Sequence, residues 1–150
     1  MMIGIGSDDA GAGLRRHVAE HLRALGHEVD DIGVDDASRA YPSIAFEMAE
    51  RIADDRYPRA ILICGTGIGV SIAANKVPGV YAALCHDTYS AKRARASNDA
   101  QILAMGSRVL GLEVALEIVD AWLQSEFDQE RSGRKVAQLR AGEVRYAQAD

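Results

Sequence analysis

The segment that decides the fold reads AILICGTGIGVSIAANKVPGV and spans residues 60–80. Its first five residues are apolar, which predicts a buried strand that ends at Cys64. Three glycines follow at alternate positions: Gly65, Gly67 and Gly69. They let the backbone turn tightly and expose consecutive N–H groups. A short helix is expected at residues 70–76, so the loop favours an anion where it meets that helix.

The same alternation of apolar runs and amphipathic stretches extends over the whole chain. Further strands are predicted at residues 1–6, 28–32, 80–85 and 102–106. A strongly charged last helix is expected at residues 128–140, followed by a loosely held tail at 141–150. Five strands separated by helices predict an α/β fold with a five-stranded parallel sheet and helices on both faces. We expect one doubly wound, Rossmann-like domain over residues 1–150.

Ligands of open parallel sheets bind beyond the C-terminal ends of the strands, where strand order reverses. The glycine loop after Cys64 is therefore the leading candidate site. It is not a Walker A loop, because no Gly-Lys-Ser/Thr closes it, and its GxGxG spacing differs from the GxGxxG of dinucleotide-binding folds. A phosphatase loop would need Arg at position 70, which is Val. A tight turn beside a buried, inert cysteine remains the alternative at this point.

Net charge and cysteine count limit the classes of partner. The formal net charge of −5 argues against nucleic acid or an anionic membrane as the main partner. An anionic small molecule would need a local cluster of Arg and Lys. The two cysteines, Cys64 and Cys85, do not make a disulfide framework, and no apolar run approaches the length of a membrane span. We expect a cytoplasmic protein.

The chemistry available at Cys64 is that of an activated thiol. Backbone donors beside a thiol favour its thiolate. The same donors would stabilise an oxyanion that develops on a bound carbonyl.

Several segments resemble the ribose-5-phosphate isomerase B family, which includes the galactose-6-phosphate isomerase subunits. The similarity covers nearly the whole chain, and the glycine loop with its SIAANK continuation is its most specific part. The other matching segments are GSDDAG at 6–11, Tyr41-Pro42, TYSAKRARASNDAQILAMGSRV at 88–109 and IVDAWL at 118–123.

The resemblance implies an aldose–ketose isomerase of the ribose 5-phosphate/ribulose 5-phosphate type, and hence a place in the pentose phosphate pathway. The implied reaction is a 1,2-proton shift through a cis-enediolate, without metal or organic cofactor. One branch of the family uses a cysteine as the base and the other a glutamate further along the loop. Cys64 matches the cysteine, and Val70 fills the place of the glutamate.

The resemblance also assigns the remaining site residues. Thr66 corresponds to a hydroxyl near the reacting oxygens, and Asn98 to a side-chain donor that assists the enediolate. The implied substrate-binding residues are Asp8, Asp9, Tyr41, Gly65, Gly67, Gly69, Ser97, Arg108, Arg131 and Lys135. The last three match basic residues that hold the phosphate, some of them supplied by a partner subunit. The resemblance therefore implies a homodimer with shared sites, and a tetramer stays open.

Three histidines typical of the family are replaced, by Asp9, Ser97 and Ser132. The residue at Ser97 is the one implied to open the sugar ring. A four-carbon sugar phosphate has O4 blocked by the phosphate and cannot close a five-membered ring. The replacement thus favours erythrose or erythrulose 4-phosphate as an alternative substrate. Drift with an unchanged ribose substrate, or an unphosphorylated sugar, also remains open.

Two other classes of function compete with an isomerase. One is a silent module that keeps the fold and binds a sugar phosphate, although such a module would not need Cys64, Thr66 and Asn98 together. The other, a thiol-dependent hydrolase, lacks a His to pair with the cysteine. His17 and His21 are four residues apart on a predicted helix, but no third ligand supports a metal site. We expect none.

Overall fold

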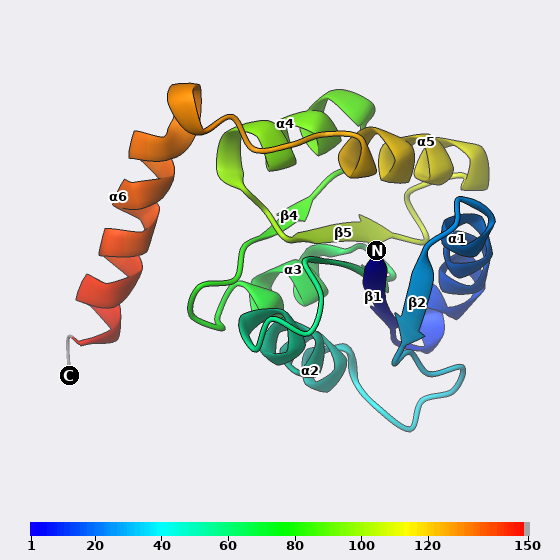
Figure 1. Cartoon of the computed structure of the whole chain (residues 1–150). Helices are drawn as coiled ribbons and strands as arrows, with labels where there is room; N and C mark the ends of the chain where they lie inside the picture. The colour runs from blue at the N-terminus through cyan, green and yellow to red at the C-terminus, as the bar shows by residue number, and fades with distance from the viewer. Residues whose placement is uncertain (149–150) are drawn as a thin grey trace.

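The computed structural model describes residues 1–148 and contains one parallel sheet with helices on both faces (Figure 1). The strands are β1 (Met2–Ser7), β2 (Glu28–Asp31), β3 (Arg59–Cys64), β4 (Ala82–Leu84) and β5 (Ile102–Gly106). The helices are η1 (Asp9–Gly11), α1 (Ala12–Ala24), α2 (Tyr41–Ala53), α3 (Ile68–Ala74), α4 (Thr88–Asn98), α5 (Leu112–Leu123) and α6 (Gln129–Ala147). The predicted fold class is confirmed.

The strand order β2-β1-β3-β5-β4 places β3, the most apolar strand, at the centre. Successive side chains of β3 point to opposite faces of the sheet. Ile61 and Ile63 pack with α1, α4 and α5, whereas Leu62 and Cys64 pack with α2 and α3. The thiol that the sequence singled out therefore lies on the α2–α3 side.

The strand order reverses at β1, since β2 lies on one side of β1 and β3 lies on the other, parallel to it. The C-terminal ends of β1 and β3 are therefore the switch point where a doubly wound sheet opens a crevice. Asp8 and Asp9 follow β1, and the glycine loop follows β3.

The last helix differs from the prediction, because α6 continues seven residues beyond position 140. Glu143 accepts a hydrogen bond from the Gly79 N–H at 2.9 Å, and Arg140 lies 3.4 Å from Asp99. These contacts join the last turns to distant parts of the chain, so residues 141–147 are helical where a loosely held tail was expected. Residues 149–150 of that tail lie outside the described residues. Within residues 1–148, no helix is both long and apolar enough to cross a membrane.

Candidate active site

A cavity of about 550 Å³ opens at the switch point, above the ends of β1 and β3. It brings together eight of the residues that the sequence singled out: Asp8, Asp9, Tyr41, Cys64, Gly65, Thr66, Gly69 and Arg108. They come from four separate segments of the chain. The fold alone therefore assembles most of the predicted site within one copy.

Cys64 lies at the bottom of this cavity, where β3 ends. Its residue is only 4% exposed, and its Sγ accepts a hydrogen bond from the Gly67 N–H at 3.1 Å. A hydrogen bond donated to sulfur stabilises negative charge there. The thiol is thus placed to act as a base toward a ligand in the cavity.

The second cysteine, Cys85, lies just beyond β4 and does not line the cavity. Burial, and to a lesser degree the charge of Asp87, raises the pKa of its thiol to about 11. Cys85 therefore stays protonated and chemically inert at neutral pH.

The glycine loop adopts a shape that larger residues could not share. Gly67 has a φ of 76°, and a Cβ there would lie 2.6 Å from the Leu84 side chain. A Cβ on Gly69 would lie 2.5 Å from the ring of Tyr41. The Thr66 hydroxyl accepts the Ile68 N–H at 3.2 Å, which fixes the tip of the loop.

The opposite wall of the cavity carries two carboxylates. Asp8 caps the η1 turn by accepting the Gly11 N–H at 3.1 Å, and Asp9 begins that turn. A Cβ on Gly11 would lie 2.6 Å from the Ile63 carbonyl oxygen, so the turn packs directly on β3. Carboxylates at this wall can accept hydrogen bonds from sugar hydroxyls.

Arg108 supplies a positive charge at the rim. Its backbone N–H donates to the Gly65 carbonyl at 3.0 Å, and its guanidinium extends over Gly65. Among residues 1–148 it forms no ion pair. Its charge is available to an anionic ligand.

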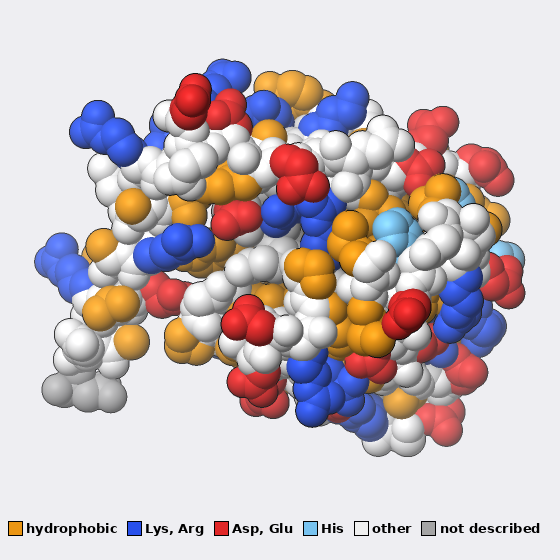
Figure 2. Space-filling view, viewed as in Figure 1, with side chains coloured by type: hydrophobic (Ala, Val, Ile, Leu, Met, Phe, Trp, Pro, Cys, Tyr) orange, Lys and Arg blue, Asp and Glu red, His pale blue; other side chains and the backbone are white. Residues whose placement is uncertain are grey.

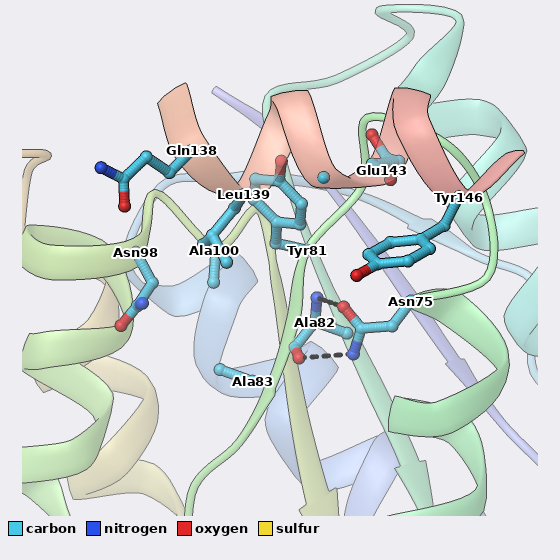
Figure 3. Close-up of a pocket in the computed structure, with 11 residues that line it drawn as sticks. Asn75, Tyr81, Ala82, Ala83, Asn98, Ala100, Gln138, Leu139, Glu143 and Tyr146 are labelled. Carbon is cyan, nitrogen blue, oxygen red and sulfur yellow. Dashed lines mark hydrogen bonds between the residues drawn. The ribbon is translucent and has the colours of Figure 1, made fainter. Parts of the chain in front are cut away.

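Asn98, predicted to assist the reaction, does not reach this cavity. It ends α4 and lines a separate groove of about 620 Å³ between α6 and the β4 edge of the sheet (Figure 3). Tyr81 and Leu139 project into this groove, and burial together with the charge of Glu143 raises the pKa of Tyr81. The neighbouring Ser97 accepts a hydrogen bond from Arg93.

The basic residues of α6 are also absent from the cavity. Arg131 and Lys135 are exposed on its first two turns, whereas Ser132 between them is buried. Figure 2 shows basic side chains along this helix and hydrophobic side chains in the hollow beside it. Gly67 points its N–H at Cys64 and does not line the cavity.

Three residues that line the cavity were missed by the sequence analysis: Ala10, Ile68 and Ile72. Ile68 and Ile72 line the cavity beside Cys64 although they are 50% and 57% exposed. An apolar pair four residues apart on a short helix usually marks a buried face. Their exposure, on the helix that follows the glycine loop, is the signal that they have another role.

The four histidines of the chain do not belong to any group of possible metal ligands in the described residues. His21 Nε2 lies 2.6 Å from Asp120 Oδ1 and joins α1 to α5. Over residues 1–148, no three His, Cys, Asp or Glu side chains are grouped as a metal ion would require. His86, which follows β4, does not line the cavity either.

Comparison with known proteins places the chain in a family. Residues 3–139 match the model of the Ribose/Galactose Isomerase family. D-erythrulose-4-phosphate isomerase of Pectobacterium atrosepticum is 46% identical over 141 residues, 93% of each chain. Ribose-5-phosphate isomerase B of Escherichia coli is 43% identical over 144 residues, 95% of this chain and 97% of the other.

Solved structures agree with these sequence matches. The structure of ribose-5-phosphate isomerase B from Clostridium thermocellum superposes with a TM-score of 0.94 at 46% identity. The match covers 97% of this chain and 99% of that one. The chain therefore belongs to the Ribose/Galactose Isomerase family and is an isomerase, as its sequence predicts.

Proposed function

We propose that the protein interconverts a phosphorylated aldose and its ketose through a cis-enediolate, with Cys64 as the base. The observation that carries the proposal is the Cys64 thiol, hydrogen-bonded by the Gly67 N–H, at the base of a cavity that also holds Asp8 and Arg108. A thiolate needs a reduced compartment, so we place the activity in the cytoplasm.

The proton path follows from the chemistry of the base. The thiolate removes the proton from C2 of the open-chain aldose, and the electron pair forms the C1–C2 double bond of the enediolate. As that double bond forms, the carbonyl electron pair moves to O1. The thiol then returns the proton to C1 while the proton of the O2 hydroxyl passes to O1, which gives the ketose. We assign the role of donors to these oxygens to the backbone N–H groups of the glycine loop and the Thr66 hydroxyl, because this loop lines the cavity beside Cys64.

The length of the sugar is the open part of the proposal. Ribose 5-phosphate is the substrate implied by the resemblance, and it would place the enzyme in the pentose phosphate pathway. A four-carbon sugar phosphate is favoured by one observation: position 97 carries a hydroxyl, already bonded to Arg93, where the resemblance expects a ring-opening His. Relatives with both kinds of name are about equally similar to this chain.

We also propose that the active site is completed by a second copy of the chain. One region of the molecule holds the base and two protruding apolar residues, Ile68 and Ile72. The other holds an apolar groove with Asn98 at its edge and exposed Arg131 and Lys135 on α6. In a two-fold dimer each region would meet its counterpart twice, so both sites would be completed together.

The deciding experiment measures isomerisation of four-, five- and six-carbon sugar phosphates, in ordinary and in deuterated water. We expect turnover of the four- or five-carbon substrates, with solvent deuterium entering at the carbon that receives the proton. Tight binding of a sugar phosphate without turnover would instead indicate a silent binding module and contradict the proposal.

A further inference from the structure

We propose that Ser107 is a positioning residue that holds the Asp8–Asp9 wall in register with Cys64. The inference rests on the proposed function. Ser107 directly follows β5, and its backbone N–H donates to the Cys64 carbonyl at 2.9 Å. Its side-chain hydroxyl donates to the Ala10 carbonyl at 2.8 Å. One residue thus joins the strand that carries the base to the turn that carries the carboxylates.

The η1 turn has few hydrogen bonds that could hold it against the rest of the chain. The η1 turn has only three residues, and Asp8 caps it locally through the Gly11 N–H. Among the hydrogen bonds of residues 1–148, the Ser107 hydroxyl alone reaches Asp9–Gly11 from a distant part of the chain. Its loss would leave the local bonds between Asp8 and Gly11 and the packing against Ile63 to fix the wall.

The same chain segment also places the cation at the rim. Arg108 follows Ser107 and donates its backbone N–H to the Gly65 carbonyl at 3.0 Å. Gly106 precedes it, and a Cβ there would lie 2.6 Å from the Thr66 carbonyl. The end of β5 is therefore held against the glycine loop by backbone contacts, and these remain when the Ser107 side chain is changed.

This separation makes Ser107→Ala informative. The substitution deletes the bond to Ala10 and retains both backbone bonds to residues 64 and 65. We expect kcat/KM to fall about tenfold, the scale of one hydrogen bond, mainly through a higher KM because the wall faces the substrate. Ser107→Thr keeps the hydroxyl and is expected to restore most of the loss.

A matched control is available at Ser125. Its hydroxyl donates to the Ala121 carbonyl at 2.7 Å just after α5, and it does not line the cavity. Ser125→Ala therefore deletes the same kind of bond and should change stability but not KM. If Ser107→Ala lowers thermal stability as Ser125→Ala does, with KM and kcat of the folded protein unchanged, Ser107 is merely structural and the proposal is wrong.

Amide hydrogen exchange separates this inference from the proposed function. Ser107→Ala should speed exchange in residues 8–13 and leave residues 60–64 protected, whether or not the chosen sugar is turned over. If the wild type is inactive but Ser107→Ala shows this exchange pattern, the proposed function is wrong and the positioning role of Ser107 stands. Unchanged exchange in residues 8–13 of Ser107→Ala would show that Ser107 does not position this turn.

Discussion

The Cys64 cavity and the groove beside α6 are built in opposite ways. The cavity is framed by the ends of three adjacent strands, and its glycine loop, η1 turn and Arg108 are joined by hydrogen bonds and close backbone contacts. The groove is mainly apolar, and α6, the last helix of the chain, forms one side of it (Figure 1). Glu143 and Arg140 join the later part of this helix to the rest of the chain.

This contrast separates the residues that we propose for catalysis from those that we propose for substrate recognition. In our proposal, the base Cys64 and its backbone donors lie within one copy. Asn98 on α4 and the cations of α6 act from another copy in this proposal, and two of the three positions that differ from the family pattern, Ser97 and Ser132, lie on the same two helices. Substrate choice could then change on α4 and α6 without disturbing the position of Cys64.

The largest effect is expected when the base is removed. Cys64→Ala should lower kcat by about 10³-fold or more, within the range of acid–base catalysis, while folding and substrate binding are retained. Cys85→Ala is the matched control, because that thiol lies outside the cavity and stays protonated with its pKa of about 11. Substantial isomerisation by Cys64→Ala, measured by steady-state kinetics, would remove Cys64 from its role.

A loss of about 10²-fold in kcat is expected from Asn98→Ala, the scale of one lost donor to a developing oxyanion. Within one copy, Asn98 lines the groove and not the Cys64 cavity, so the contrast between the two regions predicts no effect unless a second copy is present. Gln138→Ala, in the same groove, is the control and should retain most activity. Equal kinetics for both variants would argue against a shared site.

Ser97→His tests the length of the sugar. The added imidazole should raise kcat/KM for ribose 5-phosphate by about 10-fold or more relative to erythrulose 4-phosphate, because acid–base help at ring opening matters only for the cyclic substrate. The two substrates are compared in wild type and variant. If wild type already prefers ribose 5-phosphate and the variant gains no selectivity, the ring-opening argument is wrong.

The smallest effect concerns the attachment of α6. Glu143→Ala removes the bond to the Gly79 N–H and should cost about 1 kcal/mol of stability, seen as a melting temperature lower by a few degrees. Glu117→Ala, at an exposed position of α5, should change neither stability nor activity. An unchanged melting temperature for Glu143→Ala would mean that α6 is held by its other contacts.

The sheet and the position of Cys64 before the glycine loop were predictable from local pattern. Burial of β3 on both faces follows directly from its continuous apolar run, and β5 matches its predicted bounds of 102–106. β4 is shorter than predicted, since this edge strand pairs with β5 over only three residues. Arg59, buried at the start of β3, was not foreseen, because its carbonyl partners on residues 122, 123 and 125 are distant in sequence.

The rest of the site could not be assembled from pattern alone. Cys64 and Asp8 follow neighbouring strands, and parallel strands bring such residues to one edge. Asn98 and Arg131 lie on helices whose position relative to Cys64 depends on another copy in our proposal. Only the family resemblance connected them to the base, and the single chain keeps them apart.

Mixing two inactive variants tests the shared site most directly. Cys64→Ala and Asn98→Ala chains are co-expressed with different tags, and the mixed dimers are verified by native mass spectrometry before assay. If Cys64 of one copy works with Asn98 of the other, each mixed dimer regains one intact site, and a random mixture recovers about a quarter of wild-type activity. Mixed dimers that form and remain as inactive as their parents would contradict the account.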